Sequence, residues 1–542
     1  PPTRPEPGRP RPGRVGMTAE VADAFVAEHA ERATSLADEV GLRADAAVRS
    51  VAPLGVAVLG RLARRALVSG EPSQAAAHAE RAAALAGGVL SPADRLIQAR
   101  ALLQLGRTVD ALGYAEKIAA NAADAADDAT VRAGALLLAG RGYRMMGDPE
   151  RAYVTWQEAL DAATAAGRPA ERGEAMRRLG MADYLAGRLA EAGERFASAY
   201  QIAVETGDRR SQAWSLQNLA WVTTTRGDFA GADVALGRSA RRFAELGDPV
   251  GRAWMRGTTA FVRMLAGRLG EARRLARVFL PFGERVGEAW AVGTLRAVEA
   301  FAAAEVGELA EADREARRSY RDFAAADDDW GRGLALVVRG VIARGLGEPS
   351  HATDLLTDAL EYGEKTGHPL LIGMARTIRG FVSIAQGDAE AAEADAHAVL
   401  AVVEPHDVLE AAQVGPRVLL AAARLAAGDA PAAVKLLADL AALAEVPSLL
   451  FPRREAVAYY SEALLAAGRA DEALEWARRA VAAPGEDVRS RVHAGRALAR
   501  ALAAVGQRAE AVIVASAAVR EAEATQQVSE RATTRAVLAS MS

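Results

Sequence analysis

Apolar and polar residues follow one another along this chain with the spacing of a helix. Leu189, Phe196 and Tyr200, for example, fall on one face of a helix. Hardly any segment alternates apolar with polar residues or carries the Val, Ile, Thr and Tyr runs of strands. Alanine is abundant and aromatic residues make up only 5% of the chain. The pattern predicts an all-α protein.

A short phrase recurs about every forty residues. LAGRLAEA at 185–192 returns as LAGRLGEA at 265–272 and as EVGELAEA at 305–312. Twelve copies place an alanine five residues after an anchor glycine, and their spacings are 36 to 41 residues. The anchor glycines are Gly70, Gly106, Gly147, Gly187, Gly227, Gly267, Gly307, Gly347, Gly387, Gly428, Gly468 and Gly506. A reaction needs one site, so this recurrence predicts architecture before chemistry.

Each copy also has a small residue seven positions before the anchor glycine. These residues are Ala63, Ala99, Gly140, Gly180, Ala220, Ala260, Ala300, Gly340, Gly380, Ala421, Ser461 and Ala499. Small residues at fixed points on two consecutive helices let those helices approach closely. Several copies carry a second glycine twenty residues after the first, such as Gly207 and Gly247, where another turn is expected. Each copy is therefore predicted to be a helical hairpin.

The pattern resembles the tetratricopeptide repeat over about residues 50 to 525. That family has a small residue in the first helix, glycine at the turn and alanine early in the second helix. Its usual period is about 34 residues, and a period near 40 is closer to the long variant of bacterial signal-transduction ATPases and related regulators. The resemblance implies a right-handed superhelical solenoid of about twelve antiparallel hairpins. The segments at 29–41 and 63–86 also resemble the junction in actinobacterial regulators where an ATPase module, sometimes preceded by a nucleotide cyclase domain, passes into its repeats.

Four segments are expected along the chain. Residues 1–16, rich in proline and arginine, are predicted to be a disordered linker or a tag remnant. Residues 17–69 are expected to form entry helices and residues 70–511 the repeat solenoid. Residues 512–542 are expected to form a final helix and a C-terminal cap.

The sequence offers no pattern for catalysis or for a cofactor. It lacks a phosphate-binding G-x-x-x-x-G-K-[ST] loop, a G-x-S-x-G nucleophile turn and any cysteine. His397 and His406 lie near acidic residues, but a hydrated helix end explains them better than a metal site. The net charge of −4 disfavours nucleic acid, and no run of about 18 apolar residues predicts a membrane span. We therefore predict a non-enzymatic cytoplasmic protein without metal or cofactor.

Two sets of residues are candidates for binding a partner. The first is aromatic: Trp221, Phe261, Phe301 and Phe381 lie six residues before their glycines, and Trp214 and Trp254 lie thirteen before. These side chains either fill the space between consecutive hairpins or line a groove for a peptide or hydrophobic ligand.

The second set is a file of arginines at positions eleven or eight before the glycines, which share one helical face: Arg256, Arg296, Arg339, Arg376 and Arg379. They either pair with acids such as Glu299 or form a cationic strip for carboxylates of a partner.

The predicted function is a protein-interaction scaffold or sensor, forming the C-terminal region of a larger bacterial signalling regulator. Its partner is a protein or peptide, acidic if the arginine file binds it, and the oligomeric state stays open. One alternative is a fragment of a nucleotide cyclase or signalling ATPase whose catalytic domain precedes residue 1. The other is a receptor solenoid for a peptide or small ligand.

Overall fold

The computed structural model describes residues 26–32, 46–68, 71–121, 129–403, 410–442 and 453–541, and every element in them is helical. The chain divides into two compact units, Pro1–Ala175 and Met176–Ser542. The first unit contains α2 (Ala46–Val68), α3 (Pro72–Leu85), α4 (Pro92–Gln104), α5 (Thr108–Asn121), α6 (Ala129–Met145) and α7 (Pro149–Ala165). The boundary between the units lies within α8 (Pro169–Leu185).

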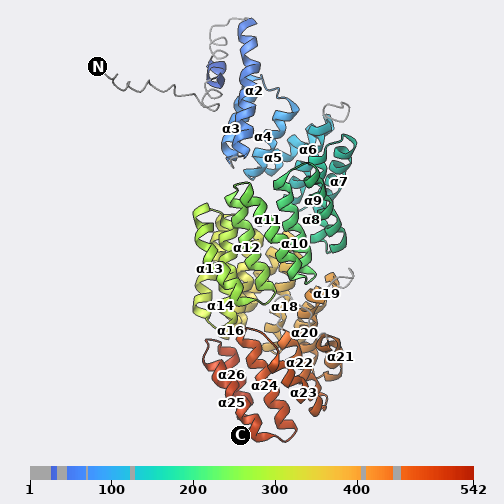
Figure 1. Ribbon diagram of the computed structural model, residues 1–542, viewed down its shortest axis with the longest axis vertical. Coiled ribbons are helices and arrows are strands. Elements are labelled where there is room, and N and C mark those ends of the chain that lie inside the picture. Colours follow the sequence, from blue (N-terminus) through green and yellow to red (C-terminus); the bar gives the residue numbers. More distant parts are fainter. Residues whose placement is uncertain are drawn as a thin grey trace, which may run out of the picture. The chain divides into compact units, whose positions relative to one another are not determined.

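The second unit continues with the same alternation (Figure 1). Its first helices after α8 are α10 (Arg209–Thr225), α12 (Pro249–Leu265), α14 (Ala289–Glu305), α16 (Asp329–Leu346), α18 (Pro369–Ala385), α20 (Glu410–Ala426), α22 (Arg453–Ala466) and α24 (Val488–Ala504). Its second helices are α9 (Leu189–Glu205), α11 (Phe229–Glu245), α13 (Leu269–Val286), α15 (Leu309–Ala325), α17 (Pro349–Thr366), α19 (Ala389–Val403), α21 (Ala430–Ala442), α23 (Ala470–Ala482) and α25 (Arg508–Glu523). The last helix is α26 (Val528–Ala539).

The predicted hairpin register is confirmed. Each anchor glycine from Gly106 to Gly506 lies between the two helices of one hairpin and has a positive φ, which glycine adopts without strain. Gly70 lies outside the described residues. Asp148 and Asp228, directly after their glycines, accept the backbone N–H of Arg151 and Gly231 and so cap the second helices.

In the hairpins that follow Gly147 to Gly347, the second turn departs from glycine once. Gly207, Gly247 and Gly287 have positive φ at this turn, and in the hairpin that follows Gly307 the same position is Asp327, with φ 51°. Aspartate tolerates the left-handed region better than most residues because its short polar side chain bonds locally. Asp327 also forms an ion pair with Arg332, at 2.9 Å.

Small and large residues compensate each other inside the hairpins. The alanines five residues after the glycines, from Ala75 to Ala511, are fully buried. A Cβ added to Gly140 would come within 2.3 Å of the Trp156 side chain, and one added to Gly340 within 2.6 Å of Leu356. At Gly140 and Gly340 the side chain of the facing second helix leaves no room for a Cβ, so glycine is required there.

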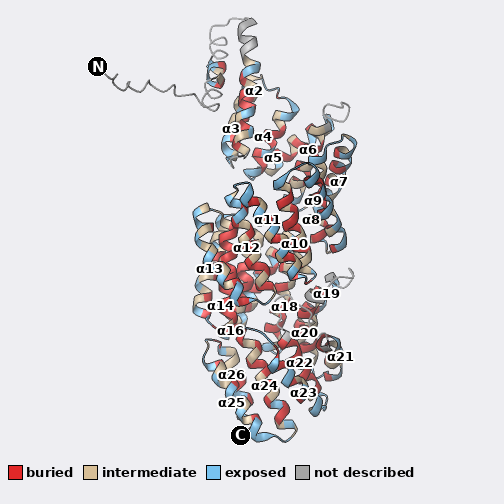
Figure 2. Cartoon of the chain, in the orientation of Figure 1, coloured by how far each residue is buried: buried red, intermediate tan, exposed pale blue. Residues whose placement is uncertain are grey.

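The first helices form the inner layer of the second unit. The pairs α12/α14, α14/α16 and α16/α18 pack directly on one another as well as on their own second helices. Figure 2 shows buried residues gathered on helices such as α10 and α12, whereas α13 is largely intermediate or exposed. The chain is thus an all-α solenoid of antiparallel helical hairpins, as predicted.

The C-terminal segment of the second unit packs back onto earlier repeats. Helix α26 packs on α16, more than 180 residues before it (Figure 1). The Gln526 backbone N–H donates to the Gly307 carbonyl at 3.0 Å, and the Gln526 side chain accepts the N–H of Ala310 at 2.7 Å. Gln527 donates to the Ala304 carbonyl at 3.2 Å. We call these contacts of Gln526 and Gln527 the C-terminal clip.

The clip supplies a helix cap from a distant part of the chain. Glu308, the residue before α15, makes no side-chain cap hydrogen bond, and Gln526 caps α15 through Ala310. Glu486 does the same for α13 by accepting the N–H of Gly270, since Arg268 provides no cap. The free N–H groups of two helix N-termini are thereby satisfied by residues 216 positions later.

Residues 1–16 and part of 17–69 lie outside the described residues, and the predicted segment boundaries stay predictions. No helix of the described part of the chain is both long enough and apolar enough to cross a bilayer.

Candidate functional site

The predicted aromatic column lies inside the solenoid. Trp221, Phe261, Phe301 and Phe381 are all buried on first helices of the second unit. The rings of Trp221 and Phe261, on consecutive first helices, lie 5.8 Å apart edge to face. Most of this column therefore packs between hairpins, and Phe301 in addition lines a cavity described below.

Trp214 and Trp254 belong to a longer row of rings that runs along consecutive first helices. Trp254 stacks on Trp290 with centroids 4.0 Å apart and planes 8° apart. The row continues with Trp330, whose ring centroid lies 6.1 Å from that of Trp290. It ends at His368, whose ring centroid lies 5.7 Å from that of Trp330. Trp290 and Trp330 lie seventeen, not thirteen, residues before their glycines, so the spacing of Trp214 and Trp254 did not predict them. A difference of four residues keeps the same helical face, and this signal could have found them.

Three of the five predicted arginines form ion pairs with carboxylates of the second helices. Arg296 donates to Glu284 at 2.6 Å and to Glu315 at 3.0 Å. Arg379 holds the buried Asp395 with two hydrogen bonds, and Arg376 joins the same carboxylate at 3.3 Å. These guanidinium groups hold adjacent hairpins together.

The other two predicted arginines lack a carboxylate partner within the described residues. The Arg256 guanidinium lies over the Phe279 ring at 4.4 Å, and burial lowers the pKa of both Arg256 and Arg339. Glu299, a candidate partner for the file of arginines, instead accepts hydrogen bonds from Arg273 and Arg277 on α13.

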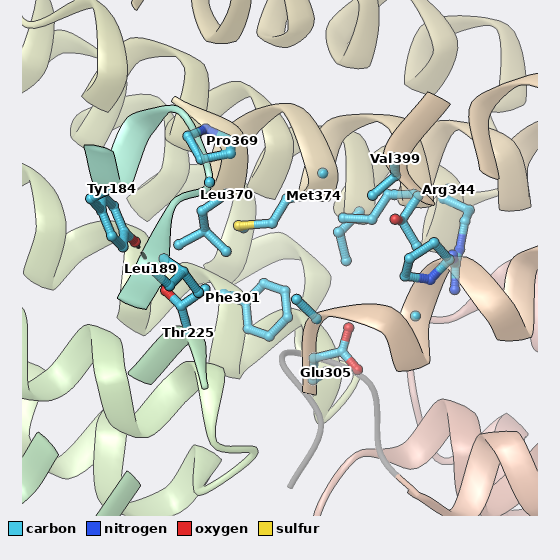
Figure 3. Close-up of a pocket in the computed structure, with 18 of the residues that line it drawn as sticks. Tyr184, Leu189, Thr225, Phe301, Glu305, Arg344, Pro369, Leu370, Met374 and Val399 are labelled. Atoms are coloured by element: carbon cyan, nitrogen blue, oxygen red, sulfur yellow. Dashed lines mark hydrogen bonds between the residues drawn. The ribbon is translucent and has the colours of Figure 1, made fainter. Parts of the chain in front are cut away.

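A partly open cavity of about 120 Å³ lies among the first helices of the second unit. Its lining comes from α8, α9, α10, α14, α16, α18, α19, α20 and α24, so distant repeats meet around it. Most of the lining is apolar: Leu189, Phe301, Val341, Leu370, Met374 and Ile378. Figure 3 shows Glu305 and Arg344 on the far side of Phe301 and Met374 from Tyr184 and Leu189.

Glu305 and Arg344 are charged residues without partners in the described part of the chain. Glu305 is only 8% exposed, yet its carboxylate forms no hydrogen bond or ion pair there. Arg344 has only a weak contact, with its guanidinium 6.0 Å from the centre of the Phe381 ring. Buried charges are normally paired, so this arrangement is unusual for a purely structural core.

Electrostatics around the cavity reflect this burial. Burial raises the pKa of Glu305 to about 7, although the nearby Arg489 and Arg344 oppose the rise. Burial likewise lowers the pKa of Arg344, and Arg489 adds to this effect. Arg489 also lines the cavity, but it is already bonded to Glu455. The cavity thus contains one carboxylate and one guanidinium that form no hydrogen bond or ion pair with the described residues.

The sequence contained a signal for these two residues that was not used. Two positions before the anchor glycine, Glu305 stands where other copies have Leu185, Leu265 or Ala385. Three positions before it, Arg344 stands where other copies have Met264 or Ile384. Glu305 is the only charge in its column, and Arg344 shares its mostly apolar column with one other charge, Arg144. A rare charge in a mostly apolar column marks a departure from the structural repeat. No group of three or more metal-binding side chains occurs among the residues described.

A second surface feature lies in the first unit. Of the fifteen large hydrophobic residues that are exposed in the described part of the chain, seven belong to this unit, which has about a third of the chain. Four of them flank two consecutive hairpin turns: Leu105, Val109, Met145 and Met146, with Val109 70% exposed. Helices α4 and α6 pack on each other, so these two turns are neighbours. We call these four residues the apolar edge.

Comparisons with known proteins bear on the fold. Residues 171–245, from α8 to α11, match the family model for the tetratricopeptide repeat. The chain is similar to the crystal structure of the APC/C hetero-tetramer Cut9-Hcn1, with a TM-score of 0.52 and 12% identity over 89% of each chain. It is also similar to a Rap protein complexed with competence and sporulation factor, with a TM-score of 0.50 and 12% identity over 65% of this chain and 98% of that one. No curated protein matches the sequence. Both structural neighbours are solenoids of the tetratricopeptide type.

Proposed function

We propose that this chain, which is a tetratricopeptide-repeat solenoid, serves as a protein-interaction scaffold whose first unit binds a partner through the apolar edge. One of the two structural neighbours is a hetero-tetramer and the other is a complex with competence and sporulation factor, which supports an interaction role. The observation that carries the proposal is the exposure of four large apolar side chains on adjacent turns. Grouped exposed apolar side chains mark interaction surfaces more often than scattered ones do.

The partner best suited to this edge is an amphipathic helix. Its apolar face would cover Leu105 and Val109 at one hairpin turn and Met145 and Met146 at the neighbouring turn. Methionine is adaptable in shape, which suits a surface that binds such a helix.

Affinity capture from the native host, followed by mass spectrometry, tests this proposal. Val109→Glu combined with Met145→Glu and Met146→Glu should lose a partner that the parent retains. Because the changed side chains are exposed, the melting temperature should stay nearly the same. The control changes three exposed valines of the second unit, Val204, Val234 and Val278, to Glu. Identical capture by the parent and both variants would rule out the apolar edge as the binding surface.

The wider context is part of the same proposal. We infer a non-catalytic role in the cytoplasm, as the C-terminal region of a larger bacterial signalling regulator of the long-repeat type. The genomic reading frame upstream of residue 1 tests this context directly, and a cyclase or ATPase domain there would favour the enzyme-fragment alternative. Purified chain should not hydrolyse ATP, and steady turnover by a homogeneous sample would contradict the non-catalytic role.

An acidic partner segment would use the unpaired arginines. Arg256 and Arg339 have no carboxylate partner among the described residues. Of the five predicted arginines, these two are therefore the best able to bind a carboxylate of a partner. Changing both to Glu should weaken capture of an acidic partner and remove its salt dependence. Unchanged capture would exclude this contact.

A further inference from the structure

The cavity of the second unit combines an apolar part with two charges of opposite sign, neither of which is paired within the described part of the chain. Leu189, Leu370 and Met374 line the apolar part, and Phe301 lies between them and the charges (Figure 3). Glu305 and Arg344 form no ion pair with each other, since no nitrogen of Arg344 lies within 4.0 Å of a carboxylate oxygen in the residues described.

Leaving these two groups unpaired is costly to the fold. A buried carboxylate that loses its water shell without gaining a hydrogen-bond or ion-pair partner destabilises the folded state. Apolar residues at the same positions, as in other copies of this repeat, would avoid that cost. Buried charges that the fold itself does not use are characteristic of binding sites.

The size of the cavity limits its occupant. A dry engineered cavity of about 150 Å³ holds a benzene molecule, and this one is about 120 Å³ and partly open. It therefore has room for one apolar side chain, with the opening available for a small polar head. Several residues of a polypeptide would not fit inside it.

We propose that this cavity binds a free apolar α-amino acid as a zwitterion, with its carboxylate on Arg344, its ammonium on Glu305 and its side chain beside Phe301 and Met374. Arginine can hold a carboxylate with two parallel hydrogen bonds. A fatty acid would leave Glu305 unpaired, and an apolar amine would leave Arg344 unpaired. The zwitterion satisfies both charges and the apolar lining together.

This binding would add a sensing role to the scaffold proposed above, and it does not depend on the apolar edge. The cavity is lined from α14, α16, α18 and α24, so an occupant would contact repeats far apart in the sequence. A ligand that binds the folded state stabilises it in proportion to the logarithm of its concentration.

Calorimetric titration of the full chain at pH 7.5 tests the ligand class. L-leucine, L-methionine and L-phenylalanine are the probes, and we expect at least one to bind and to raise the melting temperature. The matched analogues of leucine are 4-methylpentanoate, 3-methylbutylamine and N-acetyl-L-leucine, each lacking one charge. Each should bind at least tenfold more weakly than leucine. Equal binding of an analogue, or no binding of any probe, would overturn the proposal.

Substitutions locate the binding. Arg344→Gln and Glu305→Gln should each weaken binding at least tenfold, whereas Arg274→Gln and Glu191→Gln, on exposed positions of α13 and α9, should not.

A third variant guards against misfolding. Gly373 lines the cavity, and a Cβ there would meet only Val399, at 3.7 Å. Gly373→Leu should therefore fill the cavity and abolish binding while the protein stays folded. Gly237→Leu is the matched control, because a Cβ at Gly237 meets nothing within 4 Å. Binding that survives Gly373→Leu would place the ligand elsewhere and overturn the proposal.

Discussion

The two units are built from one repeat, yet among the described residues only the second unit packs its end onto an earlier part of itself. In the first unit, helix pairs such as α2/α4 and α4/α6 pack as near neighbours in the chain. In the second unit, α26 reaches α16, and Gln526 and Gln527 bond to residues around Gly307. The second unit also contains the cavity with Glu305 and Arg344, while the first exposes the apolar edge.

This difference between the units separates the contacts that each repeat specifies from the contacts that arise only when many repeats follow one another. Each hairpin dictates contacts with its nearest neighbours, so stability is nearly a sum of local terms. Contact between distant repeats requires the path of the hairpins to return on itself. In the second unit this return brings α26 onto α16, and no comparable packing is found among the described residues of the first unit.

Bulky substitutions at the hairpin contacts should have the largest effect and should separate the two units. Gly140→Leu in the first unit and Gly340→Leu in the second should each cost about 3 kcal/mol by overpacking against Trp156 and Leu356. We expect scanning calorimetry to show that each variant lowers the transition of its own unit.

The matched controls are Gly113→Leu and Gly237→Leu, where a Cβ meets nothing within 4 Å. If Gly140→Leu and Gly340→Leu lowered the same transition equally, the two units would unfold as one, and the comparison between them would fail.

A change of pH should affect the second unit through Glu305. Its folded pKa of about 7 lies above the ordinary value of 4.5, so the folded state holds this proton more tightly than the unfolded state does. Stability should therefore fall as pH rises from about 4.5 to about 7, with Arg489 and Arg344 reducing the loss and Asp487 and Glu455 increasing it.

Glu305→Gln removes this dependence. At pH 8 the variant should be more stable than the parent by about 3 kcal/mol, and at pH 4 the two should agree, as measured by urea unfolding. Glu191→Gln, on an exposed position of α9, is the control and should match the parent at both values. If the free energies of unfolding of Glu305→Gln and the parent differed by the same amount at pH 4 and pH 8, burial of the Glu305 carboxyl would not be the cause of the pH dependence.

Breaking the C-terminal clip should have a moderate effect confined to the second unit. Gln527→Leu removes the donor to the Ala304 carbonyl and should cost about 1 to 2 kcal/mol. Hydrogen exchange should then speed up at the Gln526 and Ala310 amides, which the clip protects. Amides of α4 to α7 should be unaffected.

Gln507→Leu is the control for the clip, because Gln507 is exposed and makes no cap hydrogen bond. Unchanged exchange at Gln526 and Ala310 in the Gln527→Leu variant would mean that the clip does not hold α26 in place.

The smallest expected effect concerns the turn where aspartate replaces glycine. Asp327→Gly relieves the positive φ of Asp327 and loses its exposed ion pair with Arg332. Because such pairs contribute little, the variant should gain about 0.5 to 1 kcal/mol, as measured by chemical unfolding. The matched control is Gly247→Asp, which should lose a similar amount at the equivalent turn. A loss of stability in Asp327→Gly would mean that the ion pair outweighs the backbone strain.

The sequence by itself determined the hairpins. The anchor glycines, the buried alanines and the capping aspartates act within one repeat or between neighbours, so a column of residues reveals each contact. The same columns could have revealed Glu305 and Arg344 as charges in apolar positions, and a shift of one helical turn could have revealed Trp290 and Trp330.

Only the tertiary structure decided which residues from distant repeats meet. The curvature of the solenoid arises from small rotations between repeats that accumulate over many hairpins, and no local pattern gives their sum. It brings Tyr184 within 6.1 Å of His368, places Arg489 at the cavity of Glu305 and Arg344, and joins Gln526 to Gly307. These contacts between residues more than 140 positions apart created the cavity and the clip, because their geometry depends on every hairpin between them.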